Sequence, residues 1–444
     1  MVYRLWLSPI ASFPGPFLAR ISFCYEFYYN WIKPGQYYLE IHKMHQKYGP
    51  IVRVSPVELH IERPSFYRKL FVAGAVRKSN AYPWFAQGSG FEDMVARFTD
   101  HDAHRAARVP INRFFSRASI TRVEPRVMAR VQKFCHRLQI AADTGMVVNI
   151  SNALNSLTSD IISSTIFEEP SDFLEDPDFN GEWYRQSRLR PADEAKTRSN
   201  TTIFDHLVHS ELVESHFGEG GFPRLAQLIQ NAGWRLASHS IATIIVYLCL
   251  HGDKQQKLRK ELAPLFSASP DTGPAWQELE KVSYLAACIQ EGLRISAGAM
   301  NRISRVASEC DLQFDNWLIP NGTPVSMSSY WMHMDPDVFP NPDVFEPERW
   351  IDTPAEKLKI MQSYVVPFSA GSRDCFGKNL AYMEMYHTLA QLFCPGAPRI
   401  ELYHTDESDV VPTIGLLFPW PRLDSVGVRA FLTMDDQQSI DKTN

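Results

Sequence analysis

Apolar residues recur every three to four positions over most of the chain, which is the spacing of one face of an α-helix. Residues 379–393 are typical, with Leu380, Met383, Leu389 and Leu392 at helical spacing. The same pattern predicts helices over residues 36–48, 101–116, 118–142, 150–168, 222–251, 253–266 and 283–296. Helix is therefore the main secondary structure that the sequence predicts.

A smaller part of the chain has the patterns of short strands. Residues 51–54 and 58–61 alternate around Ser55 and Pro56 and predict a β-hairpin. We expect further short strands within 303–327 and 399–431, and a proline-rich meander over 336–367. No Gly/Ser-rich linker or repeat divides the chain, so we expect one large domain over 36–432, mainly α with minor β in small sheets, and a polar tail over 433–444.

The composition narrows the class of protein. The 45 Lys and Arg residues against 50 Asp and Glu residues give a net charge of −5, so a nucleic-acid partner has no electrostatic support. The seven cysteines are odd in number and scattered without a C-x-x-C pair, which favours a reducing compartment. The longest apolar run, Ile241–Leu250, is about half a membrane span, so we expect no transmembrane segment.

One cysteine lies in a loop of unusual pattern, F-x-x-G-x-R-x-C-x-G, from Phe368 to Gly377. Gly371 permits a tight turn, Arg373 carries a forked permanent charge suited to a carboxylate, and Gly377 lets the next helix begin close by. The N-terminus of that helix would help to keep the Cys375 thiol ionised. A buried inert cysteine is the alternative. Because all five fixed positions of the pattern are present together, we instead favour a cysteine whose thiolate binds a haem iron and promotes O–O cleavage.

Two charged segments precede this loop. Glu291 and Arg294 lie three residues apart on an apolar helix and can pair, although such pairs are usually exposed and contribute little. Residues 347–350 then read P-E-R-W. The three motifs, in this order, resemble those of the cytochrome P450 family, and the resemblance covers nearly the whole chain.

The resemblance implies the cytochrome P450 fold and a haem cofactor with Cys375 as the axial ligand of its iron. It implies that Arg349 joins Glu291 and Arg294 in a buried structural cluster, and that Phe368 packs near the sulfur. The residues expected to hold the haem propionates are Arg373, His104, Arg108 and Arg305. His101 and His104 alone could suggest zinc, but no third or fourth ligand lies nearby in the sequence.

A reaction and its partners are implied as well. The family takes electrons from NADPH through NADPH-cytochrome P450 reductase, binds O2 on ferrous haem and inserts one oxygen atom into an apolar C–H or C=C bond. The chain is most similar to fungal secondary-metabolism members of the trichodiene oxygenase kind, in residues 37–40, 57–61 and 406–409. The expected substrate is an apolar terpenoid or polyketide-like small molecule. A basic patch is either a docking face for the reductase or an ordinary solvated surface; its residues are Arg105, Arg113, Arg117 and Lys378.

The oxygen side departs from the family pattern A-G-x-D/E-T-T. Ala232 and Gly233 fit it, but Arg235 replaces the acid and Leu236 replaces the alcohol that relay protons. Ser238, an ordered water or a substrate hydroxyl could substitute. A haem-thiolate isomerase or dehydratase that needs no external electrons, and a degenerate non-catalytic relative, therefore stay open as alternatives to the monooxygenase.

The chain also differs from the family in length. Relatives carry two roof helices over the pocket where this chain has only a short stretch near 180–200, so we expect a shortened roof. Residues 1–35 resemble the segment that follows a membrane anchor, which implies that the anchor is missing. The expected location is the cytoplasmic face of the endoplasmic reticulum if the full-length form has an anchor, and otherwise the cytoplasm, with peripheral membrane association.

Overall fold

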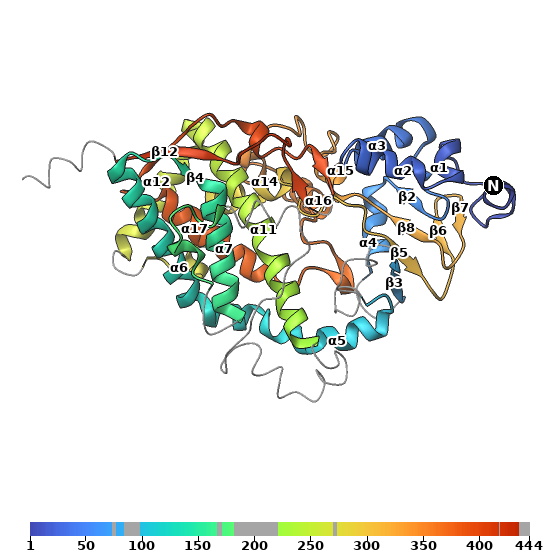
Figure 1. Ribbon diagram of the computed structural model, residues 1–444, viewed down its shortest axis with the longest axis horizontal. Helices are drawn as coiled ribbons and strands as arrows, with labels where there is room; N and C mark the ends of the chain where they lie inside the picture. Colours follow the sequence, from blue (N-terminus) through green and yellow to red (C-terminus); the bar gives the residue numbers. More distant parts are fainter. Residues whose placement is uncertain are drawn as a thin grey trace, which may run out of the picture.

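The computed structural model describes residues 1–72, 77–83, 98–166, 171–181, 221–269, 273–416 and 418–434. In Figure 1 most of the long helices gather in one half of the molecule, whereas the N-terminus and the largest sheet lie in the other half. The mainly helical class predicted from the sequence is confirmed.

Most of the predicted helices occur with bounds within two residues of the prediction. The helices are α1 (Phe17–Ile21), α2 (Cys24–Phe27), α3 (Tyr37–Tyr48), α4 (Tyr67–Leu70), α5 (His101–Phe114), α6 (Arg117–Thr144), α7 (Ile150–Ile166), α11 (Gly221–Leu250), α12 (Gly252–Ala268), α13 (Trp276–Leu279), α14 (Ser283–Ile295), α15 (Ser329–His333), α16 (Ala355–Tyr364) and α17 (Lys378–Phe393). Short 3-10 or π turns are η1 (Tyr3–Leu7), η2 (Tyr28–Ile32), η3 (Pro64–Phe66), η6 (Phe173–Glu175), η7 (Pro347–Trp350), η8 (Gly371–Arg373) and η9 (Glu407–Asp409).

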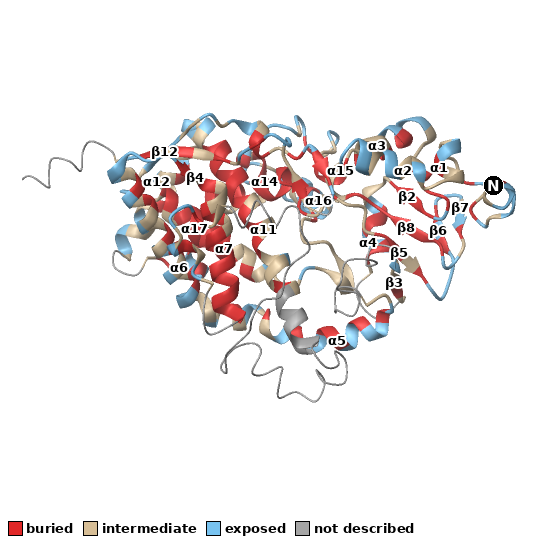
Figure 2. Ribbon diagram, viewed as in Figure 1, coloured by how far each residue is buried: buried red, intermediate tan, exposed pale blue. Residues whose placement is uncertain are grey.

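The core of the helical half forms where α11 packs against α7, and where α17 packs against α6 and α11. Figure 2 shows α7 as buried along most of its length, whereas α6 is a mixture of buried, intermediate and exposed residues. Within the described chain, only α11 contains a stretch long and apolar enough to cross a membrane, Leu228–Leu250, with mean hydropathy 1.3. Because 67% of its most apolar window is buried inside the protein, it serves here as a core helix.

The strands form four small sheets in the described residues. They are β1 (Ile51–Arg53), β2 (Leu59–Ile61), β3 (Ser79–Ala81), β4 (Val148–Asn149), β5 (Arg305–Ala307), β6 (Leu312–Phe314), β7 (Trp317–Ile319), β8 (Pro324–Ser326), β9 (Arg399–Leu402), β10 (Ile414–Gly415), β11 (Pro419–Trp420) and β12 (Arg429–Thr433). The largest sheet has the order β1-β2-β8-β5-β3, and the others are β4-β12-β9, β6-β7 and β10-β11.

The predicted hairpin is confirmed, since β1 and β2 are antiparallel with Ile51 opposite Ile61. In the same sheet, β5 pairs with β3 so that Arg305 lies opposite Ala81. This pairing brings residues far apart in the sequence to one edge of the cavity described below.

The proline-rich stretch contains two elements that the sequence pattern did not predict, η7 and α16. Met361 is the one buried residue of α16, so that helix lacks the apolar stripe on which the prediction depends. The predicted shortening near 180–200 and the polar tail fall mainly on 182–220 and 435–444, outside the described residues.

Candidate functional site

The cysteine loop is held in a tight conformation by its own backbone and by a neighbouring segment. The N–H of Cys375 donates to the carbonyl oxygen of Phe368 over 2.9 Å, and the N–H of Ser372 donates to that of Val72 over 3.0 Å. Gly371 has a φ of +79°, and a Cβ there would lie 2.5 Å from the carbonyl oxygen of Val72. The glycine predicted to shape this turn is therefore required by both conformation and space. Helix α17 begins at Lys378, directly after Gly377.

The sulfur of Cys375 lies deep in the protein but is accessible from a cavity. Burial raises the pKa of the Cys375 thiol, and the N–H of Gly377 opposes this more weakly. The contribution predicted for the helix N-terminus thus has the expected direction, but desolvation of the thiol has the larger effect on its pKa in the protein alone. A metal ion that bound this sulfur would have to displace its proton.

A cavity of about 300 Å³ opens above the sulfur. Much of its wall is apolar and comes from three helices: Ile162 and Ile166 of α7, Ile229, Ala232 and Gly233 of α11, and Leu380 and Ala381 of α17. Ala232 and Gly233, which were predicted to line the oxygen side, thus line the same cavity as Cys375. The side chain of Phe368 packs on Tyr382, with ring centroids 5.3 Å apart.

The four predicted propionate-binding residues all line this cavity: His104 and Arg108 of α5, Arg305 of β5, and Arg373 of the cysteine loop. Asp100 caps α5 by accepting from the N–H of Ala103, so the helix starts one turn before His104. His104 and Arg108 then share one face because they are four residues apart. The structure therefore gathers cations from three separate segments around one space.

Arg108 forms hydrogen bonds and an ion pair with the cysteine loop. Its guanidinium pairs with the carboxylate of Asp374 at 2.6 Å and donates to the carbonyl oxygens of Ser372 and Asp374. The sequence pattern did not indicate Asp374, which occupies a variable position of the motif. This ion pair ties α5 to the loop that carries Cys375.

Arg305 and Arg373 have no carboxylate partner among the described residues. Arg305 donates to the carbonyl oxygen of Ser304 over 3.3 Å and lies over the ring of Phe71. Arg373 donates to three backbone carbonyls of residues 98–100, and its Nε has no partner. Burial lowers the pKa of each arginine to about 10, so both stay charged at neutral pH.

His104 is kept neutral by this surrounding charge. Burial and the nearby guanidinium of Arg373, followed by those of Arg108 and Arg305, lower its pKa to about 3. A neutral imidazole still carries one N–H that can donate. Buried cations without counterions are unfavourable, so the rim of the cavity is suited to an anionic ligand.

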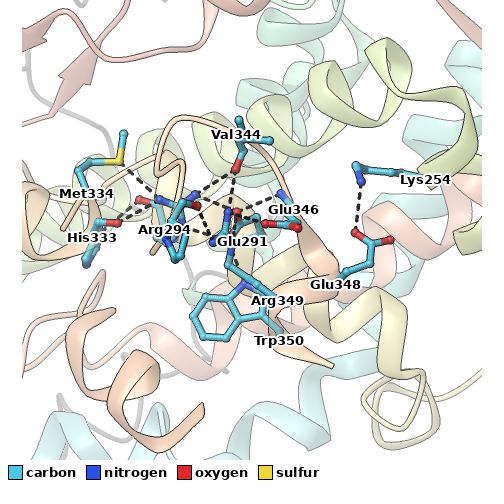
Figure 3. A network of polar contacts seen from close by, with 11 residues as sticks. Lys254, Glu291, Arg294, His333, Met334, Val344, Glu346, Glu348, Arg349 and Trp350 are labelled. Atoms are coloured by element: carbon cyan, nitrogen blue, oxygen red, sulfur yellow. Dashed lines mark hydrogen bonds and ion pairs between the residues drawn. The ribbon is translucent and has the colours of Figure 1, made fainter. Parts of the chain in front are cut away.

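The predicted structural cluster is present and fully formed (Figure 3). The carboxylate of Glu291 accepts from Arg294 at 2.8 and 2.9 Å and from Arg349 at 3.0 Å. The indole N–H of Trp350 donates to the same carboxylate over 2.9 Å. Glu291 and Arg294 have no exposed side-chain surface, so this pair is a buried one and not a surface ion pair. Glu348 of the same motif points away and pairs with Lys254.

Ser238, predicted as a substitute proton donor, does not line the cysteine cavity in the described residues. Its hydroxyl donates to Asn155 over 2.7 Å, and it faces a second cavity of about 370 Å³. Arg235 faces that cavity too, with its guanidinium 3.2 Å from the ring centre of Trp420. Ser238 follows Gly233 by five positions, and at 3.6 residues per turn this places it on another face of α11.

The basic patch is exposed as predicted. Two of its members are paired, because Arg117 pairs with Glu280 and Lys378 pairs with Asp374 at 3.0 Å. Among the described residues, no three His, Cys, Asp or Glu side chains gather to hold a metal ion. Cys375 could therefore ligate a metal only together with ligands that come from outside the described protein, such as the nitrogens of a porphyrin.

Comparison with known proteins agrees with this geometry. The family model described as "Cytochrome P450" matches residues 25–184 and 225–394. The cytochrome P450 monooxygenase oblB of Cochliobolus heterostrophus is 35% identical over 97% of this chain and 92% of its own length. The fusicoccadiene C-8 hydroxylase of Alternaria brassicicola is 36% identical over 97% of this chain and 92% of its own length. The stellatic acid synthase of Emericella variicolor is 33% identical over 97% of this chain and 91% of its own length. The chain therefore belongs to the cytochrome P450 family, whose members bind haem through a cysteine thiolate.

Proposed function

We propose that Cys375 is the axial ligand of the haem iron and that the chain uses this haem to oxygenate an apolar terpenoid-type molecule. The observation that carries the proposal is the cavity itself. It presents one accessible sulfur, apolar walls and a rim on which two cations, Arg305 and Arg373, have no carboxylate partner among the described residues. These are the features needed to bind the iron, the flat ring and the two carboxylates of a haem.

Each residue has a role in this proposal. Arg305, Arg373 and the N–H of neutral His104 would donate to the propionates, giving the buried charges the anionic partners that the protein does not provide. Arg108 acts through Asp374 and fixes the cysteine loop. Ala232 and Gly233, which line the cavity, would lie on the side of the haem where O2 and substrate bind.

When bound, haem supplies oxygen activation with electrons that originate from NADPH and arrive through a reductase. The protein's own contribution is to hold the sulfur, exclude water with the isoleucines of α7 and α11, and orient the substrate. The name of one relative specifies hydroxylation at C-8 of fusicoccadiene. We therefore expect hydroxylation or epoxidation of a hydrocarbon-rich terpenoid, in fungal secondary metabolism.

The test is the difference spectrum of the reduced protein with and without carbon monoxide. Wild type should show the red-shifted Soret band of a thiolate-ligated haem, and the Cys375→Ser variant should lose it. Cys310→Ser is the matched control, because Cys310 is an exposed cysteine that does not line the cavity. A Cys375→Ser protein with an unchanged spectrum would refute the assignment.

A second candidate function is a haem-thiolate isomerase or dehydratase. It is favoured by one observation, namely that Arg235 and Ser238 face the second cavity while Leu236 replaces the alcohol. Product formation without NADPH or reductase would support it, and strict dependence on both would exclude it.

The N-terminal segment supports peripheral membrane association. Exposed apolar side chains gather on η1, α1, α2 and η2: Trp6, Leu7, Phe17, Leu18, Phe27, Trp31 and Ile32. Arg4 and Lys33 flank them in sequence. Exposed Trp and aliphatic residues beside basic ones suit a lipid–water interface, so we propose that this surface contacts the cytoplasmic face of the endoplasmic reticulum.

The shortened roof also stays a proposal. It is supported by alignments to relatives that span 489 positions, more than the 444 residues of this chain, so the relatives carry insertions relative to it. The insertions of the relatives are consistent with a smaller cover over this pocket.

A further inference from the structure

The second cavity lies beside α11, on a different face of the helix from Ala232 and Gly233. It has a volume of about 370 Å³ and is bounded by α11, the N-terminal part of α7 and the β10-β11 hairpin. No described residue lines both this space and the cavity of Cys375. Its volume is that of a small-molecule pocket, so it is a second place where a ligand can bind.

Part of the lining of the second cavity is apolar. Ala242 comes from α11, Val410 follows η9 and Ile414 belongs to β10. Leu416 and Leu423 also line it, and 41% and 76% of their surfaces are exposed, so the cavity reaches the protein surface beside apolar side chains. Such walls suit the hydrocarbon part of a ligand.

Arg235 and His239 supply polar groups to the same space. They are four residues apart on α11 and therefore share one face of the helix. The guanidinium of Arg235 lies 3.2 Å from the ring centre of Trp420, which also lines the cavity. Nε2 of His239 is buried and has no hydrogen-bond partner among the described residues. A buried polar atom without a partner is unfavourable, so a ligand that bonds to it would be stabilised.

His239 is a neutral group beside a permanent cation. Burial and the charge of Arg235 lower the pKa of His239 to about 3. A neutral imidazole donates one N–H, and the guanidinium of Arg235 presents a planar fork of N–H donors. Together these donors match the two oxygens of a carboxylate.

Asp409 is the one carboxylate among the described residues of this lining, and it is already bonded. It accepts from Arg422 over 3.2 Å and from the hydroxyl of Ser425 over 2.6 Å. Arg235 and Arg422 give the described lining two cations against this single acid. The charge of the cavity therefore favours an anionic ligand over a cationic one.

We propose that the second cavity binds a hydrocarbon-rich carboxylic acid, with its carboxylate at Arg235 and His239 and its hydrocarbon part against Ile414 and the neighbouring leucines. The family pattern has an acid where this chain has Arg235, and an acid there would repel the same ligand. The site is thus a consequence of that replacement and belongs to this chain. It requires neither haem nor a reaction at Cys375, so it is independent of the proposed function.

The test measures the binding of two carboxylates and one alcohol to the protein as purified, by isothermal titration calorimetry. Decanoate is the fatty acid probe, abietate is the terpenoid acid probe, and decanol has the chain of decanoate without its charge. The variants are Arg235→Gln, Arg235→Lys and His239→Phe. Arg259→Gln is the matched control, because Arg259 is also a partly buried arginine but lines neither cavity.

We expect one carboxylate to bind per chain, and more tightly than decanol. Arg235→Gln should weaken carboxylate binding roughly 10- to 100-fold, the effect of losing one charge-assisted hydrogen bond. Its affinity for decanol should be unchanged, which shows that the cavity is still formed. Arg235→Lys should recover part of the affinity, since it keeps the charge but not the fork.

His239→Phe should weaken carboxylate binding roughly 2- to 10-fold, as expected for one neutral hydrogen bond, and Arg259→Gln should match wild type. The two acids distinguish the source of the natural ligand. Tighter binding of decanoate favours an acid derived from lipid, and tighter binding of abietate favours a terpenoid acid.

Three results would overturn the proposal: no binding of either carboxylate to wild type, equal carboxylate affinities of wild type and Arg235→Gln, or an equal loss in Arg259→Gln. The Soret band of the haem is recorded in the same titrations. A shift of that band that follows the measured binding and persists in Arg235→Gln would place the ligand in the cavity of Cys375 and refute the second site. The haem assignment itself is tested separately, by the carbon monoxide difference spectrum.

Discussion

Arg294 and His333 bond to each other through both their side chains and their backbones. Nη1 of Arg294 donates to the carbonyl oxygen of His333 over 3.0 Å, and Nδ1 of His333 donates to the carbonyl oxygen of Arg294 over 3.2 Å. The tautomer follows from the other ring nitrogen, since Nε2 accepts from the N–H of Val366 over 2.8 Å. The buried cluster of Glu291 is thereby connected to the segment that leads into the cysteine loop.

His333 should make the protein sensitive to acid. Burial and the charge of Arg294 lower its pKa to about 3, from an ordinary value of 6.5. A lowered pKa means that the unfolded chain takes up a proton first, so stability is full above about pH 6.5 and falls as the pH drops towards 3. We expect His333 alone to account for a loss of about 2 kcal/mol in the free energy of unfolding between pH 7 and pH 5. Denaturant titrations of wild type and His333→Asn at both pH values measure it; the exposed His136→Asn should behave like wild type.

Glu291→Gln should be strongly destabilising. It leaves Arg294 and Arg349 as buried cations without their shared anion, which costs about 3–5 kcal/mol. The control is Glu346→Gln, because Glu346 also pairs with Arg349 but is 49% exposed, and it should cost less than about 1 kcal/mol. Unfolding curves at one pH compare the two variants. Equal losses would show that burial of the cluster does not matter.

Gly371→Ala should disrupt the cysteine loop. Gly371 and Gly322 have nearly the same φ, +79° and +75°, but a Cβ built at Gly322 would have no atom within 4 Å. Gly322→Ala should therefore cost about 1 kcal/mol for its conformation alone. Gly371→Ala should cost about 1–3 kcal/mol more, because its Cβ meets the carbonyl oxygens of Phe71 and Val72. Thermal unfolding and the haem content of purified protein provide the comparison.

Arg305→Gln should weaken haem binding without lowering the stability of the haem-free protein. Because the Arg305 cation has no carboxylate partner in the haem-free protein, removing it should not lower the free energy of unfolding of that form. Haem should bind roughly 10- to 100-fold more weakly, since a charge-assisted hydrogen bond contributes about 1.5–3 kcal/mol. Haem transfer to an acceptor protein gives the affinity. Arg63→Gln is the control and should leave the affinity unchanged, because the Arg63 side chain is 42% exposed and pairs with Asp315.

The N-terminal aromatic residues should govern binding to lipid. Trp6 is 68% exposed and Trp31 is 72% exposed. Replacing both by serine should weaken co-sedimentation with anionic vesicles by roughly 10- to 100-fold, because each would bury a large apolar side chain at the interface. The exposed Leu423→Ser provides a control outside this surface. Vesicle binding that is indifferent to the tryptophans would argue against the proposed contact.

The sequence predicted the parts of the site that depend on order and spacing. Helical periodicity placed α5, α7, α11 and α17. The resemblance to the cytochrome P450 family correctly implied that Arg349 joins Glu291 and Arg294, although these residues lie on two segments far apart in the chain. Side-chain direction was less predictable. Ser238 lies near Gly233 in sequence but on another face of α11, and Arg108 is turned towards Asp374 by a contact between distant segments.

The balance between burial and helix charge could not be read from the sequence either. The ionisation state of Cys375 depends on how much protein surrounds it, and only the assembled fold determines that. The same holds for His239, whose imidazole looks like that of any other helical histidine until α11 is packed into the core.

Because Arg305 and Arg373 carry positive charges without carboxylate partners, the lifetime of the chain in a cell should depend on the supply of haem. A newly made chain that folds before haem binds must bury those charges in the cavity without an anionic partner. The haem-free protein should therefore unfold more often and be cleaved by proteases more readily. Cells short of iron or porphyrin would then accumulate less of the enzyme without any change in its messenger RNA.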